Sequence, residues 1–201
     1  DYAVLCEGQL DVIACHEAGV KNAVATQGTA CTNEHARLLK RYTGSDKVVI
    51  CYDSDFAGHD AAAKAFVEMA ALGMDVRVAT MPPGEDPDSL VKSRGPDEFQ
   101  SILEQSSEFF DYRLRYLGEE NNLDDPGTKA RVVRELSPML HAVSDKNAQE
   151  ASINFVATRL GLSPDGIRQA VVDTAKRPSR RGDQKDNPII GDRKSVCRER
   201  V

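Results

Sequence analysis

Residues 48 to 62 read VVICYDSDFAGHDAA: an apolar run stops at two aspartates, and a stretch of small residues follows. A short apolar run bounded by turn residues is typical of a buried strand, and the alanines beyond it favour a helix. Side chains two residues apart in an extended segment project to the same side, so Asp53 and Asp55 can face one site together. The stretch therefore predicts a strand that delivers two carboxylates to its carboxyl end.

The first half of the chain repeats this strand-then-helix pattern. Apolar, β-branched runs alternate with helix-patterned stretches, the runs at 3–6, 22–26, 47–52 and 75–81 and the helices near 9–18, 32–42 and 57–72. Continuous apolar runs separated by helices are typical of a parallel sheet covered on both faces. The pattern predicts an α/β fold with a four-stranded parallel sheet and flanking helices.

From about residue 87 onward the strand signals vanish. Helical patterns follow instead, at 97–105, 107–117, 128–143, 147–160 and 164–176, and they predict a small helical bundle. The polar, Arg-rich end has no periodicity and is predicted to be disordered. We expect an α/β domain over 1–107, a helical subdomain over 108–176 and a disordered basic tail over 177–201.

The net charge of −6 is unevenly distributed. Residues 176 to 201 hold nine Lys or Arg against four Asp or Glu, so the rest of the chain is strongly acidic. An acidic body is a poor electrostatic match for nucleic acid unless metal ions or another segment supply positive charge. Any function on nucleic acid must account for this deficit.

The remaining composition bounds the cellular setting. No apolar run is long enough for a membrane span, and no signal peptide is apparent, so we expect a cytoplasmic protein without a membrane partner. The five cysteines show neither a CxxC pair nor Cys/His metal spacing, which favours reduced, buried thiols over a disulfide frame or a zinc site. Because the chain starts at Asp1 and enters a strand at once, we expect a piece of a longer protein.

Acidic residues follow three of the four predicted strands: Glu7 and Asp11, then Asp53 and Asp55, then Glu85, Asp86 and Asp88. Ligands of parallel α/β sheets collect beyond the carboxyl ends of the strands. Carboxylates gathered there raise one another's pKa unless a cation neutralises them, and hard oxygen ligands suit Mg²⁺ or Mn²⁺. The sequence therefore predicts a divalent-metal site at one edge of the sheet.

Each acid also has a simpler interpretation. The aspartates of 53–58 can serve only to cap the following helix, and Asp86 with Pro87 is a good helix start in its own right. The four histidines fall on different predicted helices, so they indicate surface positions rather than metal ligands. Convergence of three loops on one edge favours the metal site over independent caps.

Four segments in this order resemble the Toprim domain of bacterial DnaG-type primases: CEGQLDVIACHEAG (6–19), AVATQGTA (23–30), VVICYDSDFAGHDAA (48–62) and PPGEDPDSLV (82–91). The resemblance covers roughly residues 1 to 110. The stretches KARVVRELSPML (129–140) and FVATRLGLS (155–163) are similar, more weakly, to the helical subdomain that follows Toprim in these primases. Ala57 replaces the third acid of the DxDxE pattern of some topoisomerases, which fits primases better.

The resemblance implies a fragment of an enzyme that joins ribonucleoside triphosphates into RNA primers on a single-stranded DNA template, with Mg²⁺ or Mn²⁺ as cofactor. A replicative helicase is the expected partner of the full protein, and basic upstream parts of the family would supply the missing positive charge. By resemblance the catalytic, metal-binding residues are Glu7, Asp53 and Asp55, the rest of the acidic rim is Asp11, Asp86 and Asp88, and nucleotide contacts come from Gly8, Gly28, Thr29, Gly58 and His59.

Three alternatives stay open on these residues. The same carboxylates can serve a Toprim nuclease or a topoisomerase that cleaves DNA, although no tyrosine has a context that suggests a nucleophile. A Toprim-like scaffold can bind a partner without turnover. Within the leading hypothesis, Glu7 can act as a metal ligand or handle a proton.

Overall fold

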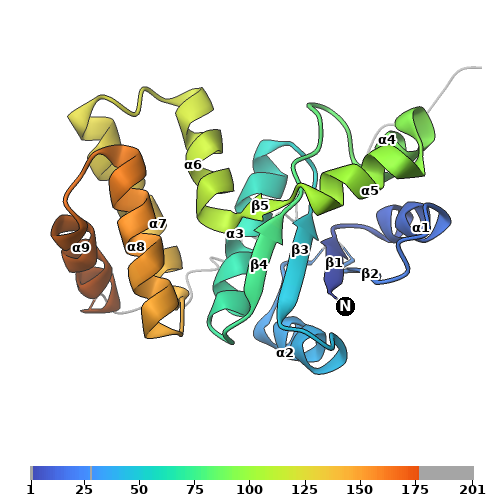
Figure 1. Ribbon diagram of the computed structural model, residues 1–201, viewed down its shortest axis with the longest axis horizontal. Helices are drawn as coiled ribbons and strands as arrows, with labels where there is room; N and C mark the ends of the chain where they lie inside the picture. The colour runs from blue at the N-terminus through green and yellow to red at the C-terminus, as the bar shows by residue number, and fades with distance from the viewer. Residues whose placement is uncertain (1, 28, 177–201) are drawn as a thin grey trace, which may run out of the picture.

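The computed structural model describes residues 2–27 and 29–176 of the 201-residue chain (Figure 1). Three predictions lie outside these residues: the turn at Gly28, the thiol of Cys197 and the disordered tail over 177–201.

A five-stranded sheet organises the N-terminal half, in the order β2-β1-β3-β4-β5. Its strands are β1 (Ala3–Cys6), β2 (Ala23–Ala25), β3 (Lys47–Cys51), β4 (Asp75–Val78) and β5 (Ser107–Glu108). The first four run parallel, which confirms the predicted parallel sheet. The two-residue strand β5 pairs antiparallel with β4, so the expectation that no strand follows residue 87 is wrong. Ser107 and Glu108 carry no apolar pattern, and their extended conformation comes from pairing with Val78 and Arg77.

Helices connect the strands and then form the C-terminal half (Figure 1). Those of the sheet half are α1 (Gln9–Glu17), α2 (Asn33–Tyr42), α3 (Phe56–Ala70), α4 (Pro87–Arg94) and α5 (Pro96–Glu104). Those of the C-terminal half are α6 (Phe109–Glu120), α7 (Pro126–Ala142), α8 (Lys146–Leu160) and α9 (Pro164–Lys176). The predicted helical bundle is confirmed, and α4 begins where Asp86 and Pro87 indicated a helix start.

Both faces of the sheet are buried, as continuous apolar strands require. Val48 and Ile50 of β3 belong to one core cluster, which also holds side chains of α2 and α3. Val49 and Cys51 belong to a second cluster, together with side chains of α1, α4 and α5. Alternate residues of one strand therefore face two helical layers, and this sandwich fixes the strand ends that carry the acids.

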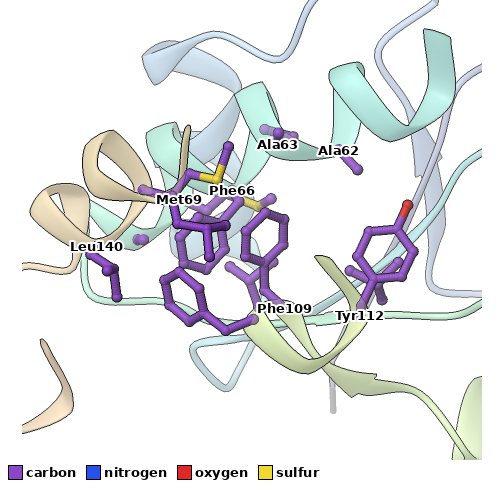
Figure 2. Packing of buried hydrophobic residues seen from close by; sticks show 14 of the residues in the cluster. Ala62, Ala63, Phe66, Met69, Phe109, Tyr112 and Leu140 are labelled. Carbon is purple, nitrogen blue, oxygen red and sulfur yellow. The ribbon is translucent and has the colours of Figure 1, made fainter. Parts of the chain in front are cut away.

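The first core cluster continues from the sheet into the helical half. The rings of Phe66 in α3 and Phe109 in α6 stack with centroids 3.8 Å apart, and Met69 and Leu140 belong to the same cluster (Figure 2). Buried side chains of α7, α8 and α9 extend it. The two halves thus share a core, and the predicted boundary between residues 107 and 108 stays a prediction.

The structure also bears on the predicted thiols and on the predicted absence of a membrane span. Cys6, Cys15, Cys31 and Cys51 are free and buried, which confirms them as small core residues. Over residues 2–27 and 29–176, no helix combines the length and the apolarity needed to cross a membrane.

Candidate functional site

The acids lie in the loops that follow β1, β3 and β4. These three strands are neighbours and run parallel, so their carboxyl ends meet at one edge of the sheet. Glu7 follows β1 directly, Asp53 and Asp55 lie between β3 and α3, and Asp86 ends the loop between β4 and α4. Asp11 lies in the first turn of α1, where its Oδ2 accepts a hydrogen bond from the Gly8 N–H at 3.0 Å.

Glu7 lies against the start of α3. A Cβ built on Gly58 would come within 3.1 Å of Glu7 Oε1 and would overlap the carbonyl oxygen of Asp53. Oε1 of Glu7 is buried and has no hydrogen-bond partner among the described residues. The loop after β1 therefore presents an unsatisfied carboxylate oxygen to the loop after β3, and such an atom is costly unless a ligand or a proton satisfies it.

The negative charges of acids in all three loops act on one another's pKa values. Burial raises the pKa of the Glu7 carboxyl and the negative charge of Asp53 adds to the shift, although a hydrogen bond from the Asp53 backbone to this carboxyl opposes it. Burial likewise raises the pKa of Asp53, with Asp86 and Asp55 as further causes. The pKa of Asp11 is raised by burial and by Asp53 and Asp86, although the Gly8 N–H opposes the shift. Burial and the neighbouring carboxylates thus make ionisation of Glu7, Asp11 and Asp53 more costly.

Two aspartates also cap helices, as the simpler interpretation proposed. Asp55 Oδ1 accepts from the Gly58 N–H at 2.7 Å and caps α3, and Asp86 Oδ1 accepts from the Ser89 N–H at 2.6 Å and caps α4. A capping carboxylate uses one oxygen for the backbone, so its second oxygen can serve another role. Capping and metal binding are therefore compatible at these two residues.

Basic side chains neutralise the acids of the β4–α4 loop more than those of the loops after β1 and β3. Lys92 lies 2.7 Å from Asp88, and Arg94 lies 2.8 Å from Glu85. Among the described ion pairs, none includes Glu7, Asp53 or Asp55. The uncompensated charge is therefore concentrated at the ends of β1 and β3.

The donor set fits a divalent cation, although no closed cage exists. In the part of the chain that the structure describes, no three His, Cys, Asp or Glu side chains are close enough to enclose a metal ion. Mg²⁺ requires no such cage, because it keeps several waters and binds through one or two carboxylates together with substrate phosphates. The orphaned Oε1 of Glu7 beside Asp53 matches that pattern.

Only some of the predicted nucleotide-binding residues lie at the acidic edge. Gly8 and Gly58 lie at the acidic edge, and Gly58 is the residue at which α3 packs on Asp53. The Thr29 hydroxyl donates to the Thr26 carbonyl at 2.6 Å and so holds its own turn. The His59 ring faces α6, where it stacks on Tyr116 with centroids 3.7 Å apart and shares a hydrogen bond with Tyr112. Contact of these residues with a nucleotide stays a prediction.

Sequence reasoning missed a group of residues behind the acidic edge. Arg113 of α6 donates to the His59 carbonyl at 3.1 Å and to Glu135 of α7 at 2.8 Å. Only the folded chain brings α6 and α7 against the start of α3, so no local signal marks these residues.

A groove in the described part of the chain lies away from the acids. A cavity of about 920 Å³ borders β2 and α2 and is lined by residues that include Val24, Leu38 and Tyr42. None of the acids that follow the strands lines it. Metal and phosphate chemistry needs charge, so the acidic edge suits it better than this groove does.

Family models match both halves of the chain. Residues 4–91 match a family described as Toprim-like, and residues 110–165 match one described as the DnaB-helicase binding domain of primase. The first range contains every acid of the predicted metal site, and the second contains most of the helical half.

Curated relatives and solved structures agree with the family models. The DNA primase of Clostridium acetobutylicum is 33% identical over 167 residues, covering 83% of this chain and 28% of the relative, and that of Listeria monocytogenes is 34% identical over 196 residues, covering 94% and 30%. A crystal structure of a DNA primase domain from Pseudomonas aeruginosa superimposes with a TM-score of 0.73 at 32% identity, covering 86% of this chain and 54% of that one. A DnaG primase catalytic domain bound to single-stranded DNA gives 0.68 at 30% identity, covering 82% and 53%. The chain thus spans less than a third of the length of these curated relatives.

Proposed function

The chain belongs to the bacterial DnaG-type primase family, and we propose that it carries the metal-binding part of a catalytic core that synthesises RNA primers on single-stranded DNA. The observation that carries this proposal is the approach of Glu7 to the Asp53–Gly58 segment, with one buried carboxylate oxygen left without a partner. Family membership supports the reaction, and this geometry supports its location at the acidic edge of the sheet.

The catalytic carboxylates in this proposal are Glu7, Asp53 and Asp55. A divalent cation bound by one or two of them, together with the substrate phosphates, would supply positive charge to the triphosphate and offset negative charge at the attacked α-phosphate. The carboxylates orient that cation, and Asp11, Asp86 and Asp88 set the negative potential of the rim. Mg²⁺ and Mn²⁺ are both consistent with oxygen ligands of this kind, and Mg²⁺ is the expected physiological ion.

The glycines around the acids let the substrate approach the backbone. Gly58 carries no side chain, and any Cβ there would displace the Asp53 carbonyl or the Glu7 carboxylate. Gly8 precedes α1, and a Cβ there would lie 3.2 Å from Asp11 Oδ2. We assign Gly8, Gly28, Thr29, Gly58 and His59 to the ribonucleotide-binding side of the site, where their small size or polarity suits phosphate and ribose groups.

The acidic character of the site shapes its partnership with DNA. A rim of carboxylates repels a template backbone, so cations and basic parts of the complete primase must supply the attraction. We assign the helical half, which matches the helicase-binding family model, to a contact with the replicative helicase. Such a complex works in the cytoplasm, at the replication fork.

The DNA-cleaving and scaffold alternatives have less support. The relatives and solved structures described above are primases rather than nucleases or topoisomerases. A scaffold without turnover would have no use for a buried, unpartnered carboxylate oxygen beside two further acids. Primer synthesis is therefore the function that the site supports best.

The test is primer synthesis by the complete primase that contains this chain. Radiolabelled ribonucleotides are supplied with a single-stranded template and Mg²⁺, and the wild type is compared with Asp53→Ala and Asp55→Ala. We expect each variant to lose primer synthesis by a factor of about 100 or more, because the carboxylates act on the transition state. Circular dichroism should show a retained fold.

Asp173→Ala is the matched control. Asp173 is an exposed aspartate of α9, paired with Lys176 at 3.9 Å, and it should be neutral in the assay. Near-normal primer synthesis by either Asp53→Ala or Asp55→Ala would remove that residue from the mechanism.

A further inference from the structure

The start of α3 is tied to the helical half through one buried arginine. The Arg113 residue is 8% exposed, and its two terminal nitrogens divide between two helices. Nη1 donates to the His59 carbonyl of α3 at 3.1 Å, and Nη2 donates to Glu135 Oε1 of α7 at 2.8 Å. A guanidinium suits this arrangement, because its donors project from one rigid plane in fixed directions.

The His59 ring is held by the same helix. Its Nδ1 shares a hydrogen bond with the Tyr112 hydroxyl, and the ring stacks on Tyr116, over which Arg113 also lies at 5.2 Å. Burial raises the pKa of Tyr112 to about 12, so its hydroxyl stays protonated and can donate. Both the backbone and the ring of His59 are therefore anchored to α6.

His59 lies in the turn that presents the acids. Its N–H donates to the Asp55 carbonyl at 3.0 Å, and the preceding Gly58 N–H donates to the Asp55 side chain at 2.7 Å. Gly58 also packs on the Asp53 carbonyl and lies beside the Glu7 carboxylate. A shift of the first turn of α3 would move the acidic loop with it.

We propose that Tyr112, Arg113 and Tyr116 of α6, with Glu135 of α7, form a clamp that positions the Asp53–Gly58 loop. These are positioning residues, because the contacts described above reach the acidic loop through His59. The helical half, which its family model describes as helicase-binding, is in this view also a structural part of the acidic site. An effect of the clamp on metal binding rests on the proposed function, whereas the clamp itself does not.

The first test is amide hydrogen exchange on the native protein, compared with Arg113→Met and Tyr112→Phe. Both substitutions keep most of the side-chain volume. We expect Arg113→Met to speed exchange at Gly58 and His59 by about tenfold or more, since hydrogen bonds to a charged group contribute on that order. Tyr112→Phe should act on the same amides to a smaller extent. Amides at the far end of α3, such as Ala71, which donates to the Val67 carbonyl, should keep their rates.

The matched control is Arg115→Met on the same helix. Arg115 is half exposed, pairs with Asp111 at 3.3 Å and donates to the Ser107 hydroxyl, so its contacts among the described residues lie away from α3. Arg115→Met should leave exchange at Gly58 and His59 unchanged. Arg113→Lys, which keeps the positive charge, should retain part of the protection that Arg113→Met loses. Unchanged exchange at Gly58 and His59 in Arg113→Met, or equal acceleration along all of α3, would overturn the clamp.

The second readout is Mn²⁺ affinity, followed by electron paramagnetic resonance. We expect Arg113→Met to weaken Mn²⁺ binding by about threefold to tenfold and Arg115→Met to leave it unchanged, because a misplaced loop presents its carboxylates less well. Equal affinities for wild type and Arg113→Met would refute the link from clamp to site. Failure of the wild type itself to bind Mn²⁺ would refute the proposed function, and the exchange data would still decide the clamp.

Discussion

Gly58 packs directly on the backbone carbonyl of Asp53, so that no side chain fits between α3 and the loop that precedes it. Because Glu7 Oε1 would also lie 3.1 Å from a Cβ at this position, one glycine governs the approach of two acid-bearing loops. This contact connects the fold to the acidic site.

Gly58→Ala should destabilise the protein, although alanine normally stabilises a helix relative to glycine. The new methyl group must displace backbone, which typically costs about 1–3 kcal/mol in the free energy of unfolding. Urea unfolding measures the change. Gly166→Ala in α9 is the control, because nothing lies within 4 Å of its Cβ position, and it should be neutral or stabilising by up to about 1 kcal/mol. Similar effects of the two substitutions would contradict the packing of Gly58 on Asp53.

Asp53→Asn should stabilise the metal-free protein in a pH-dependent way. The pKa values of Glu7, Asp11 and Asp53 are raised in the folded state, so the native protein binds protons more readily than the unfolded chain. The stability contributed by these groups is therefore present at low pH and is lost as pH rises through their raised pKa values. The excess stability of Asp53→Asn should be largest near about pH 8 and should fade as pH drops towards about 4.

Thermal unfolding in a chelator, with wild type and variant scanned over this pH range, measures that excess. Asp173→Asn serves as control, because Asp173 lies beside Lys176 rather than beside other acids. An excess that grows on acidification would show that Asp53 is not held in a repulsive cluster.

The two roles of Asp86 can be separated by paired substitutions. Asp86→Ala removes the cap of α4 and should cost about 1 kcal/mol, whereas Asp86→Asn keeps a capping oxygen and should cost much less. If Asp86 also contributes charge to the metal site, Asp86→Asn should weaken Mn²⁺ binding while stability is retained. Chemical denaturation and Mn²⁺ titration of both variants give the answer. If Asp86→Asn binds Mn²⁺ as tightly as the wild type, Asp86 has the capping role alone.

Phe109→Ala should destabilise both halves of the described chain together. Phe109 is almost fully buried and stacks on Phe66, and their cluster runs from the sheet to α9. Loss of a buried phenylalanine typically costs about 3–5 kcal/mol. Unfolding followed by far-ultraviolet circular dichroism and by limited proteolysis should show one shared transition. A helical half that melts separately from the sheet would support the predicted boundary near residue 108 instead.

The parallel sheet could be predicted because its strands are buried on both faces. Val48 to Cys51 form an unbroken apolar run, which a half-exposed strand would not have, and helix starts such as Thr32 and Asp86 carry capping side chains. Strand β5 could not be predicted, since Ser107 and Glu108 are extended only through pairing with β4.

Part of the site could be predicted from the parallel arrangement of the strands. Once the strands are parallel, the residues that follow them must share an edge, so the meeting of Glu7 with the Asp53 loop follows from topology. The anchoring of His59 to α6 does not follow in this way. It depends on how α6 and α7 pack on α3, which no local pattern in the sequence encodes.

The most direct test of the acidic site is a crystal structure of this chain with Mn²⁺, with anomalous scattering recorded at the manganese edge. The account predicts an anomalous peak at the edge of the sheet, within ligand distance of Asp53 or Asp55 and facing Oε1 of Glu7. A peak confined to other acids, or none at this edge under saturating Mn²⁺, would contradict it.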